Sequence, residues 1–339
     1  MLDLLLKPSF GIPFVPECLL MVLYHYVVHI IVRNRSQFKP SFVVLIVLGC
    51  IMNTLAFGNS FITARVPRNT AENDTFSDFF KSHDIVNNIE NFSWIQISHT
   101  LHYSFAYSQY FYHSFFCLNR FIGIAFPKNC EKIWKKSFWP VVIIIFFVPV
   151  LIVHRILFGR SFYRMGENGD FFWIDSTYSR ANIYTIMVPA TSFCTVFNIS
   201  VNIICYLKIR RKERESHSDQ RLRKMILVCL LIDSSLLILT FCNFYLNVWS
   251  SVKESPIFSG WVFFMIPYAS DVLTLSTPLQ LLLFSKNIRR MCIENVPYLR
   301  HYKGHTFFNH TTQLLTSIVS PIVPQFDSEC VATNVKYKL

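Results

Sequence analysis

Histidine and tyrosine side chains recur at helical spacing between residues 94 and 120, in an otherwise apolar stretch. His99, Tyr103, Ala106 and Tyr110 fall on one face of a helix, because residues three or four apart are neighbours there. Aromatic surfaces with a few hydrogen-bonding tips suit a small, mostly apolar ligand. For each residue alone, aromatic packing near a membrane boundary is the alternative. With two residues of the last apolar stretch added, the candidate ligand-binding residues are His99, His102, Tyr103, Tyr107, Tyr268 and Asp271.

Two carboxylates, Asp233 and Asp271, lie deep inside apolar stretches, and Glu17 lies near the end of another. A carboxylate in a bilayer is costly unless it is paired or reaches water, so both aspartates should face the interior of a helix bundle. Asp271 is a candidate ligand or proton partner. The alternative for both is a protonated carboxyl that is hydrogen-bonded to a neighbour such as Ser234 or Ser270.

The composition is that of a membrane protein. Of 339 residues, 52% are hydrophobic and only 15% are charged, whereas soluble domains carry about 25% charged residues. The net charge of +12 raises the question of nucleic acid, but the basic residues fall in alternate loops, so we expect no nucleic-acid partner. The 10 cysteines form no CxxC and no pair with zinc-ligand spacing, so we expect no metal, no cofactor and no loop disulfide.

Seven apolar stretches of 20 to 27 residues are each long enough to cross about 30 Å of hydrocarbon. They predict an all-α membrane protein, a seven-transmembrane helix bundle. A short amphipathic helix over residues 285–296 should follow, so that residues 1–300 form the transmembrane domain and residues 301–339 a cytoplasmic tail. The predicted spans are residues 11–32, 41–64, 94–120, 139–158, 182–207, 225–248 and 261–284.

The distribution of lysine and arginine predicts the orientation. The loops on one side, together with the tail, carry 23 of these residues, and the loops on the other side carry 8. Because cytoplasmic loops are richer in lysine and arginine, the N-terminus should lie outside and the C-terminus in the cytoplasm. The loop over residues 65–93 is then extracellular, and its Asn73-Asp-Thr75 sequon predicts a glycan on Asn73.

One string of residues is distinctive in its spacing. The third span ends in Asn119-Arg120-Phe121, Phe126-Pro127 follows, and then comes Glu131-Lys132-Ile133-Trp134. Pro127 cannot continue a helix, so the chain should turn there and begin a basic loop over residues 121–138. The string and the seven-span pattern resemble the nematode seven-helix chemoreceptors, namely the serpentine receptor class gamma family, with its sibling class V as the alternative.

The resemblance implies a docking surface for a heterotrimeric G protein on the cytoplasmic side. It assigns coupling to Asn119, Arg120, Arg210 and Arg211; the alternative is that such charges only set the orientation. The chain also departs from the rhodopsin-like pattern. Asn119 replaces the acid before the arginine, and the seventh span keeps Pro278 but lacks the usual Asn and Tyr. These departures leave the detailed activation mechanism open.

The leading hypothesis is a multi-pass plasma-membrane chemosensory receptor, not an enzyme, that binds an extracellular small molecule and signals through a heterotrimeric G protein. The alternative is a multispanning transporter or channel. Transporters usually show paired repeats and broken helices, whereas this chain has an odd number of spans and only 9 glycines. An intramembrane enzyme would need a GxSxG motif or a His/Asp metal set at matched depth, and the sequence has neither.

Overall fold

The computed structural model describes residues 8–83, 94–166, 169, 171–178, 180–213, 236–238, 240–245, 270, 275, 277–282 and 285–295. The chain divides into two compact units, Met1–Ile288 and Arg289–Leu339. The description that follows concerns the first unit, except for helix α11 (Lys286–Asn295), which crosses the boundary.

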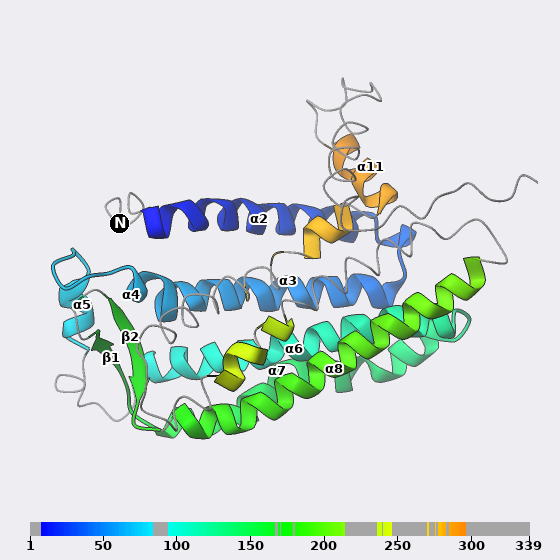
Figure 1. Ribbon diagram of the computed structural model, residues 1–339. Coiled ribbons are helices and arrows are strands. Elements are labelled where there is room, and N and C mark those ends of the chain that lie inside the picture. Colours follow the sequence, from blue (N-terminus) through cyan, green and yellow to red (C-terminus); the bar gives the residue numbers. More distant parts are fainter. Residues whose placement is uncertain are drawn as a thin grey trace, which may run out of the picture. The chain divides into compact units, whose positions relative to one another are not determined.

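Long helices dominate the first unit (Figure 1). α2, α3, α6, α7 and α8 form most of it, and α6 packs against α3, α7 and α8. Short segments, namely the 3-10 turn Arg35–Gln37, the π-helical turn Phe61–Arg65, α4 and α5, connect the long helices. The bounds are α2 Pro8–Arg33, α3 Pro40–Ser60, α4 Val66–Arg68, α5 Ser77–Lys81, α6 Trp94–Ala125, α7 Cys130–Phe158 and α8 Arg180–Glu213.

Four helical segments are long and apolar enough to cross a membrane: Phe14–Arg33, Pro40–Arg68, Cys130–Phe158 and Asn182–Arg211. They match the predicted first, second, fourth and fifth spans, and α6, 32 residues long, coincides with the predicted third. The predicted sixth and seventh spans lie largely outside the described residues. A mainly helical membrane protein is therefore confirmed, while the count of seven spans stays a prediction.

Proline marks the start of α3 and the turn after α6. Pro40 occupies the first turn of α3, where its missing N–H costs no hydrogen bond. α6 ends at Ala125 and the chain turns through residues 126–129, as Pro127 predicted. The basic loop predicted over residues 121–138 is wrong, however, because α7 begins at Cys130. The lysines of this first part of α7 are exposed, so a charged helical extension looked like a loop in the sequence.

A small antiparallel sheet departs from the predicted all-α fold. Strands β1 (Ser161–Met165) and β2 (Phe172–Ser176) pair from Ser161 opposite Ser176 to Met165 opposite Phe172. The hairpin shares one apolar cluster with α5 and the start of α6, formed by Phe80, Ile95, Tyr163, Phe172 and Ile174. We call this assembly, residues 66–83 together with β1 and β2, the hairpin cap.

Hydrogen bonds attach the hairpin cap to the helices. The Gln96 side chain donates to the carbonyl of Gly159 (2.7 Å), and the Tyr163 hydroxyl donates to the carbonyl of Ile62 (3.3 Å). Burial raises the pKa of the Tyr163 phenol, which therefore keeps its proton for this bond. Within the described part of the chain, none of its eight cysteines forms a disulfide. In this part of the chain, hydrogen bonds and apolar packing hold the cap.

α3 and α6 approach each other closely at Gly49. A Cβ on Gly49 would lie 2.3 Å from Cζ of Tyr112, which is nearer than two carbon atoms approach without a bond. Tyr112 is fully buried, so no other side chain fits at position 49 while that ring keeps its place. Around this contact α6 lies against α3 on one side and against α7 and α8 on others, so the predicted ligand helix is central in the first unit.

Candidate functional site

Three of the predicted ligand residues form one cluster near the start of α6. The Tyr103 ring lies between two imidazoles, with its centroid 5.3 Å from that of His99 and 5.5 Å from that of His102. His99 Nδ1 lies 3.0 Å from the Ser161 hydroxyl of the hairpin cap, and His102 Nδ1 lies 3.2 Å from the Thr63 hydroxyl. The structure thus brings these residues together and links them to β1 and to the π-helical turn Phe61–Arg65.

Tyr107 lies one turn further along α6, in a different environment. Only 1% of it is exposed, and it belongs to an apolar cluster contributed by α6, α7, α8 and Cys242. Tyr103 and Ala106 pack against the same cluster, so one surface of α6 is continuous from the histidines to Tyr107. The other two predicted ligand residues, Tyr268 and Asp271, lie outside the described residues.

One described residue of the last predicted span lies beside α6. Ser270, the residue before Asp271, donates its hydroxyl to Oε1 of Gln109 at 3.3 Å. Gln109 is buried on α6, six residues after Tyr103. The described part of the last predicted span therefore begins next to the helix that carries the aromatic cluster.

At the other end of α6, Arg120 contacts an aromatic ring and a side-chain amide. Its guanidinium carbon lies 4.3 Å from the centre of the Phe116 ring, and Nη2 donates to Oε1 of Gln280 at 3.3 Å. Gln280 is 9% exposed, so this hydrogen bond is shielded from solvent. Asn119, the residue before Arg120, is 8% exposed and faces inward. Sequence reasoning found Arg120 but missed Gln280, which is 160 residues away.

Arg210 and Arg211 are exposed at the end of α8, beside the buried Ile209. Lys208 lies 5.9 Å from the centre of the Phe126 ring, which brings the end of α8 close to the turn after α6. We call Arg120, residues 126–129, Arg210 and Arg211 the Arg120 face. The predicted coupling residues thus share one end of the helices.

Glu131 fixes the start of α7 to the start of α3. Its Oε1 accepts from the Ser41 hydroxyl at 2.8 Å and its Oε2 from the Ser41 backbone N–H at 3.3 Å. A carboxylate at a helix N-terminus satisfies an unpaired N–H group and interacts favourably with the helix dipole. Glu131 belongs to the string that carried the family resemblance, but its role as a tether was not predicted.

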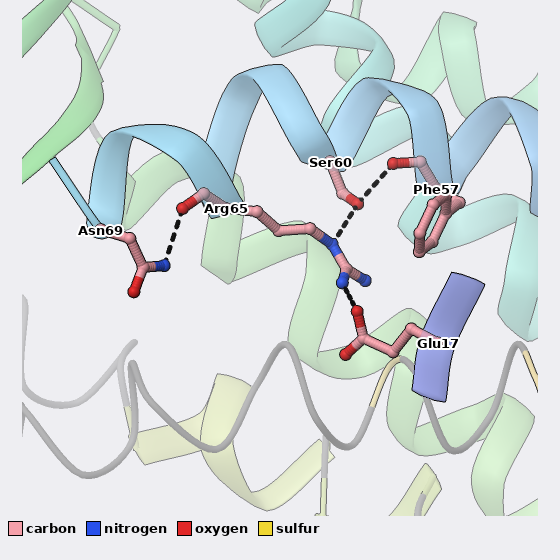
Figure 2. Close-up of polar contacts among 5 residues, drawn as sticks. All are labelled: Glu17, Phe57, Ser60, Arg65 and Asn69. Atoms are coloured by element: carbon pink, nitrogen blue, oxygen red, sulfur yellow. Dashed lines mark hydrogen bonds and ion pairs between the residues drawn. The ribbon is translucent and has the colours of Figure 1, made fainter. Parts of the chain in front are cut away.

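A buried ion pair joins α2 to the segment after α3 (Figure 2). Arg65 pairs with Glu17, and their side chains are only 11% and 10% exposed. Arg65 also donates from Nε to the Ser60 hydroxyl at 3.1 Å and lies 4.6 Å from the centre of the Phe57 ring. The sequence placed Glu17 near a span end and Arg65 at a loop boundary, but no local pattern joined them.

An aromatic cluster thus lies at one end of α6, and Arg120, in contact with Gln280, lies at the other. Among the described residues, no group of three or more His, Cys, Asp or Glu side chains could hold a metal ion. Comparison with known families decides the identity, because a model of the Srg chemoreceptor family matches residues 11–292.

The chain belongs to the Srg family of chemoreceptors.

Curated relatives of this Srg chain agree. The chain is 25% identical over 278 residues to serpentine receptor class gamma-31 of Caenorhabditis elegans, covering 79% of this chain and 86% of that protein. It is 23% identical over 219 residues to serpentine receptor class gamma-9 of the same organism, covering 64% and 61% of the two chains. The resemblance drawn from the string between Asn119 and Trp134 is confirmed, and the gamma class is the one matched. This Srg protein is an integral membrane protein of a sensory serpentine receptor family.

Proposed function

We propose that this Srg protein is a plasma-membrane chemosensory receptor that binds an extracellular small molecule and signals through a heterotrimeric G protein. The observation that carries the proposal is the contact of Arg120 with Gln280, at the same end as Arg210 and Arg211. A guanidinium can exchange its contacts with an aromatic ring and an amide oxygen for contacts with a docking partner.

Two polar contacts support communication along α6. Gln109 accepts from Ser270, and Arg120 donates to Gln280. Each contact joins an earlier residue of α6 to an earlier residue of the last predicted span, or a later one to a later one. The residue numbers rise together from one contact to the next on both segments, so the two segments run in the same direction. This is the relation expected of the third and seventh spans of one bundle.

The mechanism proposed is a shift in population between two arrangements of the helices. A ligand that contacts the cluster of His99, His102 and Tyr103, with Tyr107 and the predicted Tyr268 and Asp271, binds one arrangement better and so stabilises it. Movement of α6 against the last span then alters the contact between Arg120 and Gln280. The released Arg120 face, with Asn119, would engage the G protein.

The topology proposed for this function has seven spans, an extracellular N-terminus and a cytoplasmic tail over residues 301–339. It places the hairpin cap outside the cell and the Arg120 face in the cytoplasm. The charge distribution supports this orientation. Asn73, exposed on a turn of the hairpin cap, is then open to glycosylation.

The function is tested by expressing the receptor with a promiscuous G-protein α subunit and screening a panel of small organic molecules for evoked nucleotide exchange. At least one molecule should act on the receptor and not on untransfected cells. Ligand flux into receptor-containing vesicles, without nucleotide exchange, would instead indicate the transporter or channel.

The cluster around Tyr103 should set ligand potency. With an agonist from this screen, Tyr103→Ala removes the ring between the two histidines and is expected to weaken potency by about tenfold or more, which corresponds to roughly 1.4 kcal/mol. Tyr103→Phe keeps the ring and serves as the matched control for packing. Equal potency of the Tyr103→Ala and wild-type receptors, at equal surface level, would place the ligand elsewhere.

A further inference from the structure

A small crevice lies between α6, α7 and α8, away from the histidines. It is shallow and largely open to the surroundings, and the space that it encloses is about that of one water molecule. Tyr107 of α6 lines it, and Arg155 of α7 lines it together with Asn182 of α8. The remaining wall is largely apolar, with isoleucines from α7 and α8. The crevice therefore joins a few hydrogen-bonding groups to a hydrocarbon-like surface.

The hydroxyl of Tyr107 is the buried polar group of this crevice. It has no hydrogen-bond partner among the described residues, although only 1% of the residue is exposed. Leaving a buried hydroxyl unpaired costs free energy, and this cost is recovered when an acceptor enters. An occupant of the crevice should therefore present an oxygen acceptor to Tyr107.

Arg155 supplies a positive charge at the same crevice. It lies in the last turn of α7 and is exposed, and within the described part of the chain it forms no ion pair. A guanidinium binds the oxygens of carboxylate or phosphate through paired hydrogen bonds. The matching occupant is therefore anionic.

The position of the crevice indicates how an occupant arrives. Arg155 is three residues from the end of the apolar segment Cys130–Phe158, and Asn182 begins the segment Asn182–Arg211. The crevice thus lies where hydrocarbon gives way to headgroups. Ile186, on its wall, is 45% exposed, and the nearby Leu151 of α7 is 68% exposed. These side chains face lipid when the helices cross a membrane, so the crevice opens toward the bilayer.

We propose that the crevice binds the anionic headgroup of an amphiphile that enters from the bilayer. One headgroup oxygen fills the enclosed space and accepts from the Tyr107 hydroxyl, Arg155 pairs with the negative charge at the open mouth, and the alkyl chain lies along the exposed Ile186 and Leu151. A membrane phospholipid and a free amphiphilic ligand share this chemistry. This proposal rests on the proposed function, since Tyr107 is a predicted ligand residue. Its test measures labelling and needs no signalling, so failure of the crevice proposal can be distinguished from failure of the proposed function.

The experiment uses the purified full chain in phosphatidylcholine nanodiscs and a dodecyl phosphate probe that carries a diazirine and an alkyne. Light-induced labelling should concentrate in peptides of α7 and α8. Arg155→Gln and Tyr107→Phe should each reduce it, the first by about tenfold, as expected for loss of a charge-assisted hydrogen bond. Arg160→Gln, which changes an exposed arginine outside the crevice, is the matched control and should label as the wild type does.

Two further arms complete the test. A dodecanol probe with the same diazirine should not show the dependence on Arg155, because it carries no charge. Competition by phosphatidylglycerol placed in the nanodisc would identify a bilayer phospholipid as the occupant, whereas competition by free dodecyl phosphate alone would identify a free amphiphile. Labelling that is unchanged by both Arg155→Gln and Tyr107→Phe would overturn the proposal.

Discussion

Arg120→Ala is expected to reduce agonist-evoked nucleotide exchange roughly 10- to 100-fold while leaving the receptor at the cell surface. Arg120 lies at the end of α6, where it contacts Phe116 and Gln280. Its removal takes away the cation that we propose for docking. A hydrogen bond to a charged group contributes about 1.5–3 kcal/mol, so its loss should reduce coupling roughly 10- to 100-fold. The measurement is a dose–response curve at matched surface expression.

The matched control for Arg120→Ala is Arg35→Ala, which removes an exposed arginine from the short turn after α2. If basic residues serve only to orient the chain, the two variants should behave alike. Gln280→Leu tests the tether itself, because it removes the acceptor and leaves Arg120 in place. Basal nucleotide exchange should then rise by up to about tenfold, since one long hydrogen bond lies at the weak end of its range. A normal dose–response curve for Arg120→Ala would remove this residue from coupling.

The second large effect concerns the ion pair between Glu17 and Arg65 (Figure 2). Glu17→Leu or Arg65→Leu alone leaves one charge buried without its partner, which costs about 3–5 kcal/mol. Each single variant should therefore unfold at a clearly lower temperature in detergent and yield less monodisperse protein. The reversed pair, Glu17→Arg with Arg65→Glu, should recover part of the loss. Removing both charges together should cost less than removing either one.

The control for this pair is Lys81→Ala, which breaks a surface ion pair with Glu72 in the hairpin cap. These two side chains are 42% and 49% exposed. Exposed pairs contribute about 0–1 kcal/mol, so this change should barely move the melting temperature. If the single variants at Glu17 and Arg65 have the melting temperature of the wild type, the ion pair does not stabilise the packing of α2 against the segment after α3.

The sequence predicted the elements whose signals are local. Pro127 marked the turn after α6, and long apolar stretches marked α2, α3 and α8. The start of α7 was placed too late, at Trp139, because Lys132, Lys135 and Lys136 lower the hydropathy of a segment that is nevertheless helical. Charged residues near a membrane boundary are compatible with a helix that extends into water.

Features that depend on distant residues were missed. The strands β1 and β2 were not predicted, because they are short and their apolar side chains pack against Phe80 and Ile95, far away in the chain. The partners of Arg120 and Arg65 are likewise distant, so no spacing rule identifies them. His99, His102 and Tyr103 were grouped correctly because helical spacing is local, whereas the hydroxyls of Ser161 and Thr63 beside them come from other elements.

Glycosylation mapping tests the orientation on which both the ligand site and the Arg120 face depend. The full chain, translated with microsomes, should carry a glycan on Asn73, which is exposed in the hairpin cap, and none on the tail sequon Asn309-His-Thr311. Asn73→Gln should therefore remove most of the glycosidase-sensitive shift in mobility, and Asn309→Gln should leave it unchanged. The opposite result, a glycan on Asn309 and none on Asn73, would place the Arg120 face outside the cell and contradict coupling to a G protein.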